Sequence, residues 1–105
     1  MAQVSPQIIA RINNFIDYVE QSGIPIEKAI LFGSYANGSA NKWSDIDLAM
    51  VSSKFEGNRY YDLDKLVDAR LKVDSDISPL PYNPNDWTLE NLFVKEILKT
   101  GIVIR

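Results

Sequence analysis

The chain contains neither cysteine nor histidine among its 105 residues. Without cysteine there can be no disulfide bond, thiolate metal ligand or cysteine nucleophile. This composition fits a reducing compartment, and we expect a cytoplasmic protein. Without histidine there can be no Ser-His-Asp or Cys-His triad and no imidazole zinc site. Acid–base and metal chemistry must therefore come from carboxylates, hydroxyls, lysines or a bound ion.

Long apolar runs and excess positive charge are also missing. No apolar run approaches the roughly 20 residues that cross a membrane. Residues 1–20 lack the basic start and unbroken apolar stretch of a signal peptide. The formal net charge is −3, whereas a general nucleic-acid binder is usually basic. We therefore expect no membrane association and no direct nucleic-acid binding. A length of 105 residues predicts that residues 1–105 form one domain.

What the chain does contain is a pattern of short apolar segments separated by turns. This pattern predicts an α/β or α+β domain with three or four short strands covered by helices. Ser5 and Pro6 are typical of a helix start, and Asp86 is a candidate cap for the last helix. Prolines at positions 79, 81 and 84 are expected to break regular structure after the third strand. Helices are predicted at residues 6–22, 59–71 and 87–100, and strands at 29–32, 45–51, 73–78 and 102–104. The apolar residues of the last two helices that are expected to face the core are Leu63, Leu66, Val67 and Leu71, and Leu89, Leu92, Phe93 and Ile97.

Two carboxylates, Asp45 and Asp47, lie two residues apart in a predicted strand. Side chains at this spacing share one face of a strand and are roughly 6.5–7 Å apart at their bases. Their oxygens can converge on one divalent ion or bracket two, and magnesium prefers such ligands. A third carboxylate from the next strand would complete the site, with Asp76 preferred and Asp74 as the rival. Taken alone, the pair also fits two solvated acids at a strand edge.

A small-residue turn, Gly33-Ser34, directly follows the first predicted strand. Glycine allows backbone amides to approach a phosphate closely, and a serine hydroxyl adds a hydrogen-bond donor. Alone, the dipeptide equally fits an ordinary turn between a strand and a helix. Its position shortly before the two carboxylates places a phosphate-binding element next to a metal-binding element. This combination is typical of nucleotide chemistry.

The order and spacing of these residues resemble the nucleotidyltransferase superfamily of the DNA polymerase β type. The pattern resembles most closely that of the minimal nucleotidyltransferases that pair with HEPN-domain proteins. The family pattern begins with Gly-Ser, an aromatic or basic residue, Ala, Arg or Lys, and Gly. After a short spacer it continues with Ser-Asp-Ile-Asp-Leu. The matching residues here are Gly33, Ser34, Tyr35, Ala36, Gly38, Ser44, Asp45, Ile46, Asp47 and Leu48.

The resemblance implies a nucleotidyltransferase fold with a short mixed β-sheet flanked by helices. It implies that Gly33 and Ser34, with Ser44, contact the nucleoside triphosphate. The carboxylates that would bind Mg²⁺ are Asp45, Asp47 and Asp76 (or Asp74). Two Mg²⁺ ions are expected. The third acid would also help to activate the acceptor hydroxyl. The family transfers a nucleoside monophosphate and releases pyrophosphate. We expect AMP to be transferred from ATP, although no residue selects the base.

The resemblance also implies a partner. Members of the paired group act as antitoxins that silence an HEPN ribonuclease by binding it, by adenylylating it, or by both. Larger relatives carry further domains that hold the base and the acceptor. The acceptor surface for this chain is therefore expected to come from a second chain, either a copy of itself or a different protein. Transfer to a small molecule such as an aminoglycoside is less favoured, because no second domain forms a drug pocket.

One residue departs from the family pattern. Asn37 occupies the position where the family has Arg or Lys. A cation there would offer charge-assisted hydrogen bonds to phosphate, whereas an amide offers only a neutral donor. Lys42 lies nearby in the sequence and could replace the missing charge. The alternative function is therefore a nucleotide-binding module with weak or lost catalysis, which neutralises its partner by direct binding.

Overall fold

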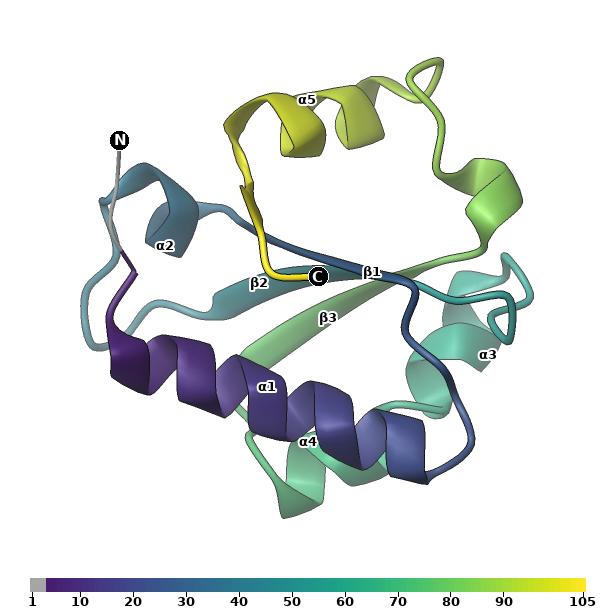
Figure 1. The fold of residues 1–105 in the computed structure, drawn as a ribbon, viewed down its shortest axis with the longest axis horizontal. Helices are drawn as coiled ribbons and strands as arrows, with labels where there is room; N and C mark the ends of the chain where they lie inside the picture. The colour runs from purple at the N-terminus through teal and green to yellow at the C-terminus, as the bar shows by residue number, and fades with distance from the viewer. Residues whose placement is uncertain (1–3) are drawn as a thin grey trace.

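The structure, a computed structural model, describes residues 4–105. A four-stranded mixed sheet with the strand order β3-β2-β1-β4 forms its centre (Figure 1). Strand β2 runs antiparallel to β1 and parallel to β3, and β4 runs antiparallel to β1. The strands are β1 (Lys28–Phe32), β2 (Ile46–Val51), β3 (Ile77–Tyr82) and β4 (Ile102–Val103). The expected α/β architecture with a short mixed sheet is confirmed.

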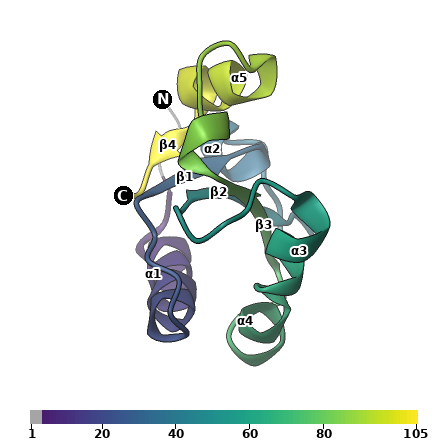
Figure 2. The same cartoon turned by 90° about the vertical axis from the view of Figure 1, so that its right-hand side faces the viewer.

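Helices cover both faces of this sheet. Figure 2 shows α5 on one side and α1 with α4 on the other. Within residues 4–105, no helix has both the length and the apolar character needed to cross a membrane. The helices are α1 (Pro6–Gln21), α2 (Ser34–Asn37), α3 (Arg59–Asp64), α4 (Val67–Lys72) and α5 (Leu92–Thr100), with a 3₁₀ turn, η1, at Pro84–Asp86.

Helix α1 forms as the sequence predicts. The Ser5 side chain caps it by accepting a hydrogen bond from the Ile8 N–H, and Pro6 occupies its first turn. Its apolar stripe is fully buried against one face of the sheet and belongs to the larger hydrophobic core. The members of the stripe are Ile12, Phe15, Ile16 and Val19.

The opposite face of the sheet carries a second, smaller core beneath α5. Val94 and Ile97 of α5 pack there against Ile30 and Ala49 of the sheet. Ala49 is fully buried, although it lies on the same side of β2 as Asp47, which is half-buried. On this side of β2, the polar residue Asp47 therefore lies at the start of the strand, and the buried Ala49 follows it.

The third strand differs from its prediction. It occupies residues 77–82 instead of 73–78, and Pro79 and Pro81 lie inside it. Strand β3 is an edge strand, and proline is tolerated there when its nitrogen faces outward. The carbonyls of Asp76 and Tyr82 accept hydrogen bonds from the N–H groups of Ile46 and Ser52. The backbone polar groups of the even-numbered residues therefore face β2, and the nitrogens of both prolines face the open edge. The prolines thus protect the edge instead of ending the strand.

Two predicted helices also differ. The helix expected at residues 59–71 is divided into α3 and α4, and Leu71 is 78% exposed instead of facing the core. The last helix begins at residue 92 and is capped by Asn91, not by Asp86. Of its expected inward residues, Ile97 is buried, whereas the residues that lie outward are Leu89, Leu92 and Phe93. Asn91 accepts hydrogen bonds from two backbone amides of α5, which explains the later start.

Candidate active site

Gly33 and Asp47 approach each other closely at one end of the sheet. The antiparallel register pairs Phe32 with Asp47, so the turn after β1 passes beside the Asp47 carboxylate. Gly33 has φ +75° and ψ −150°, a combination that side-chain-bearing residues rarely adopt. A Cβ atom at Gly33 would lie 2.3 Å from Asp47 Oδ2. Only glycine therefore allows this close approach.

Ser34 begins the short helix α2 directly after this turn. The carbonyl of Gly33 accepts hydrogen bonds from the amides of Ala36 and Asn37, at 3.0 and 3.1 Å. The first amides of a helix have no acceptor inside it, so those of Ser34 and Tyr35 remain free of intrahelical bonds. The Ser34 hydroxyl and these amides thus lie on the same turn as Gly33. The turn ends at Gly38, whose φ of +83° closes the helix.

Asp45 and Asp47 lie close enough to influence each other. Burial raises the pKa of Asp47, and the Asp45 carboxylate raises it further. Asp45 itself is exposed and precedes β2 by one residue. The repulsion between the two carboxylates would be relieved by a cation held between them. The structure places Asp45 directly before β2 and Asp47 within it, at the same end of the strand.

Ser44 has a role within the loop that leads to the two acids. Its hydroxyl accepts a hydrogen bond from the Asn41 N–H, and its own N–H donates to the Asn41 carbonyl, both at 3.0 Å. These bonds close the turn immediately before Asp45. Ser44 therefore sets the direction from which the chain enters β2.

Asp76 lies one residue before β3, beside the start of β2. Its carbonyl accepts a hydrogen bond from the Ile46 N–H at 2.9 Å. The parallel register pairs Ile46 with Ile77, which places the Asp76 backbone next to Asp45. The Asp76 carboxylate, however, accepts a hydrogen bond from Arg11 of α1 at 2.8 Å. Asp74, the rival third acid, is held by the same guanidinium group through two hydrogen bonds.

The side chains of these acids are thus not gathered around one point. Within residues 4–105, no group of three acidic side chains lies close enough to hold a metal ion. The residue of β3 that pairs with Asp47 is Ser78, which offers a hydroxyl instead of a carboxylate. The backbone brings Gly33, Asp45, Asp47 and Asp76 to one end of the sheet, but the Asp76 side chain points to α1.

Asn37, which departs from the family pattern, stabilises the end of α2. Its side-chain oxygen accepts hydrogen bonds from the N–H and the hydroxyl of Ser39, at 3.0 and 2.6 Å. Lys42, the candidate replacement for the missing cation, has its ammonium group over the Trp43 ring, 4.8 Å from the centroid. Both residues are exposed, and the Lys42 ammonium is held by a cation–π contact.

A cavity of about 290 Å³ opens beside Gly33, between the sheet and α5. Phe32 and Phe93 line it and meet edge to face, with ring centroids 5.9 Å apart. Asn37 and Glu96 are also part of its wall. The sequence did not indicate this cavity, because Phe93 was expected to point into the core and is instead 52% exposed.

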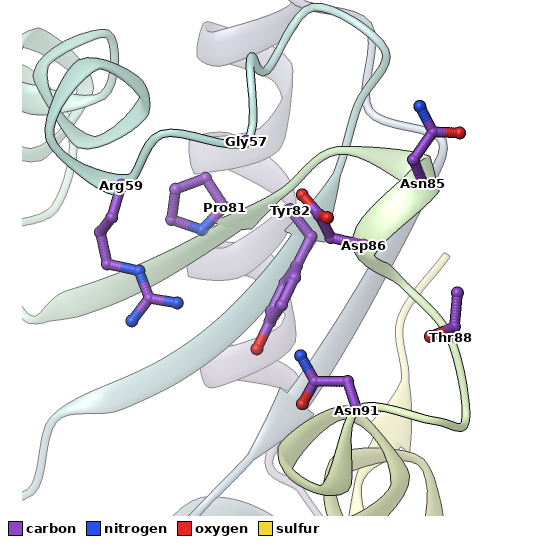
Figure 3. Close-up of a pocket in the computed structure, with 8 residues that line it drawn as sticks. All are labelled: Gly57, Arg59, Pro81, Tyr82, Asn85, Asp86, Thr88 and Asn91. Carbon is purple, nitrogen blue, oxygen red and sulfur yellow. The ribbon is translucent and has the colours of Figure 1, made fainter.

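A second, polar pocket of about 380 Å³ lies farther along β3 (Figure 3). Arg59, Tyr82 and Asn91 point toward its interior, and Asp86 lines it beside Tyr82. Within residues 4–105, neither Arg59 nor Asp86 belongs to an ion pair. Burial raises the pKa of Tyr82, and the nearby Arg59 cation partly counters this effect. The sequence missed this pocket because Asn91 was expected inside the last helix.

Two curated relatives resemble the chain in sequence. A protein from Methanocaldococcus jannaschii assigned as a protein adenylyltransferase is 31% identical over 90 residues, which cover 77% of this chain. A Haemophilus influenzae protein assigned as the protein adenylyltransferase MntA is 33% identical over 86 residues, which cover 80% of this chain. The matched regions are 61% and 69% of the lengths of these two relatives.

Solved structures resemble the chain in fold. A Sulfolobus solfataricus crystal structure assigned as a nucleotidyltransferase gives a TM-score of 0.68 at 17% identity, covering 92% of this chain and 78% of that one. A chain of a toxin–antitoxin crystal structure with AMP-PNP gives 0.57 at 23% identity, covering 88% of this chain and 71% of that one. The nucleotidyltransferase domain model matches residues 12–104, and the protein therefore belongs to the nucleotidyltransferase domain family.

Proposed function

We propose that the protein is a magnesium-dependent nucleotidyltransferase that transfers AMP from ATP to a hydroxyl group of a partner protein. The observation that carries this proposal is the approach of Gly33 to Asp47, with Asp45 beside it. This arrangement puts a turn that a phosphate can approach against two carboxylates that repel each other. Relatives assigned as protein adenylyltransferases support the choice of AMP and of a protein acceptor.

The donor set fits a hard divalent cation. Asp45 and Asp47 offer carboxylate oxygens, which magnesium prefers. Burial raises the pKa of Asp47, and the neighbouring Asp45 carboxylate raises it further. We propose that Asp45, Asp47 and Asp76 hold the metal, of which two ions are expected. The bound metal would supply charge neutralisation for the phosphates and for the attacking oxygen.

The transfer is a substitution at the α-phosphorus of ATP. The acceptor hydroxyl oxygen forms a bond to this phosphorus, and the bond from the α-phosphorus to the bridging oxygen of the β-phosphate breaks. Pyrophosphate leaves, and the hydroxyl proton passes to the Asp76 carboxylate before it reaches water. Gly33, Ser34 and Ser44 would hold the triphosphate. Each role follows from the family resemblance and the position of the residue.

Position favours Asp76 over Asp74 as the third acid. The Asp76 backbone is fixed beside Asp45 by the hydrogen bond from Ile46. The Asp74 side chain is only 9% exposed and accepts hydrogen bonds from two nitrogens of the Arg11 guanidinium group. Asp76 has a side chain that is 67% exposed and can rotate without disturbing the core.

We further propose that the partner is a toxin of the HEPN type and that this protein is its antitoxin. The fold similarity to a chain of a toxin–antitoxin complex supports this partner class. The acceptor hydroxyl would belong to the toxin. A second copy of this chain is the alternative acceptor. A transfer assay with and without the toxin distinguishes these two acceptors.

Transfer is tested with radiolabelled ATP, Mg²⁺ and the product of the adjacent gene. We expect labelled partner protein with the wild type and none with Asp47→Ala. The matched control is Asp64→Ala, which removes an exposed carboxylate from α3 and should leave the label unchanged. Undiminished label with Asp47→Ala would refute the proposed role of this acid.

A second candidate function is neutralisation by direct binding, without catalysis. Two observations favour it: Asn37 replaces the family cation, and Arg11 holds the Asp76 carboxylate. The two functions are separated by the double variant Asp45→Ala/Asp47→Ala in cells that produce the toxin. Retained protection would show that binding suffices, whereas lost protection with retained complex formation would show that transfer is required.

A further inference from the structure

Arg11 joins α1 to the segment that precedes β3, and it contacts two acids at once. Its Nε and Nη2 atoms donate to the two oxygens of Asp74, at 2.6 and 2.7 Å. Its Nη2 atom also donates to Asp76 Oδ2 at 2.8 Å. A bidentate pair of this kind fixes the guanidinium plane. The position of Arg11 is therefore set by Asp74, and Asp76 is the additional ligand.

The two acids differ in how firmly they are held. The Asp74 side chain is 9% exposed and accepts two hydrogen bonds from Arg11. The Asp74 Oδ1 atom also accepts the Asp76 N–H at 3.1 Å. The Asp76 side chain is 67% exposed, and among residues 4–105 its carboxylate accepts a hydrogen bond from Arg11 alone. An exposed ion pair contributes little to stability, so the Asp76 contact breaks easily while the Asp74 contacts persist.

The backbone of Asp76 does not need to move for its side chain to change partner. The hydrogen bond from Ile46 fixes it at the start of β3, next to Asp45. Neighbouring strands lie only about 4.8 Å apart, so a change of side-chain rotamer decides which group the carboxylate contacts. In the structure it contacts Arg11, which comes from the helix on the far face of the sheet from α5.

We propose that Arg11 is a positioning residue that holds the Asp76 carboxylate away from Asp45 and Asp47 and competes for it with the divalent metal. This inference rests on the proposed function, because it assigns a regulatory role at the same site. Metal binding then requires the Arg11–Asp76 contact to break, while Asp74 keeps Arg11 close enough to recapture the carboxylate. The protein without metal is thereby held in a state that lacks its third acid.

The proposal is tested by titrating the protein with Mn²⁺ alone and measuring the EPR signal of the free ion. Four proteins form a double-mutant cycle: the wild type, Arg11→Met, Asp76→Asn and the combined variant. We expect Arg11→Met to tighten Mn²⁺ binding about two- to fivefold, the range expected when one exposed charge pair no longer competes. We expect the combined variant to bind Mn²⁺ as weakly as Asp76→Asn.

The cycle separates competition for Asp76 from a general charge effect. If Arg11 acted only by repelling the metal ion, its removal would tighten Mn²⁺ binding in the Asp76→Asn background as well. Equal tightening in both backgrounds, or no tightening in Arg11→Met, would overturn the proposal. Asp47→Asn tests the site itself, because unchanged Mn²⁺ binding in that variant would refute the proposed metal site and, with it, the competition.

Arg11→Met leaves the nearly buried Asp74 carboxylate without its cation, which can prevent folding. If Arg11→Met does not fold, the variant Arg11→Met/Asp74→Asn replaces it, because this variant removes both charges. Its Mn²⁺ affinity is then compared with that of Asp74→Asn. Thermal unfolding is measured for every protein before titration. Tightening of Mn²⁺ binding in this second pair supports the competition, and its absence overturns it.

Discussion

Replacing Gly33 with alanine should damage both the stability and the metal site of the protein. The φ of +75° with ψ −150° is a region in which a residue other than glycine costs about 1–3 kcal/mol. The new Cβ would also lie 2.3 Å from Asp47 Oδ2, so the carboxylate must rotate. Moving a side chain away from its rotamer costs about 0.5–1.5 kcal/mol. The free energy of unfolding should therefore fall by roughly 2–4 kcal/mol.

Urea unfolding followed by tryptophan fluorescence measures this loss. With a slope of about 1–3 kcal/mol per molar urea, the midpoint should fall by roughly 1–3 M. Gly23→Ala is the matched control, because Gly23 also has a positive φ, +103°, but its Cβ would meet no atom within 4 Å. It should lose about 1–2 kcal/mol from backbone strain alone and should bind Mn²⁺ as the wild type does.

The two variants together test the reasoning about the site. The clash concerns Asp47 alone, so Gly33→Ala should weaken Mn²⁺ binding even where the protein is fully folded. If Gly33→Ala and Gly23→Ala lose equal stability and bind Mn²⁺ equally well, the close approach of Gly33 to Asp47 is not a feature of the folded protein. The central observation behind the proposed function would then be wrong.

Two further predictions concern charge at the site. Burial and the Asp45 carboxylate raise the pKa of Asp47, so the folded state binds this proton more readily than the unfolded state, and ionised Asp47 lowers stability above its raised pKa. Asp47→Asn should therefore be more stable than the wild type at pH 7, and this difference in stability should disappear as the pH falls below about 3.8. Urea unfolding midpoints of both proteins at pH 7 and pH 3 measure the difference. Equal midpoints at pH 7 would contradict the prediction. Asn37→Arg should tighten ATP binding by about 1 kcal/mol through a charge-assisted contact, although it removes the Asn37–Ser39 hydrogen bonds. Calorimetric titration with ATP measures the affinity, and Asn37→Gln is the neutral control. An equal change of ATP affinity in both variants would refute the charge argument.

Local sequence signals predicted the elements whose stability is local. Ser5 and Pro6 cap α1 whatever the rest of the chain does, and the apolar spacing from Ile12 to Val19 marks its buried face. The alternation at the start of β2 likewise identified Asp45 and Asp47 as neighbours. The motif around Gly33 indicated the family because it fixes residue type and order together.

Elements that depend on distant contacts were predicted less well. Pro79 and Pro81 break a strand in the middle of a sheet but are tolerated at an edge, and only the strand order makes β3 an edge. The outward position of Phe93 depends on how α5 lies on the sheet, since its edge-to-face contact is with Phe32. The rule that proline breaks a strand misplaced the end of β3, and the spacing of apolar residues alone misplaced Phe93.

The sequence by itself determined the family, the helix α1, and the placement of a glycine turn before two adjacent acids. Tertiary structure alone decided that Phe32 pairs with Asp47, which brings Gly33 against the carboxylate. It also decided that Asp76 contacts Arg11, a residue 65 positions away. The physical reason is that capping and periodicity act within a few residues, whereas strand register and ion pairs join segments whose proximity the sequence pattern does not encode.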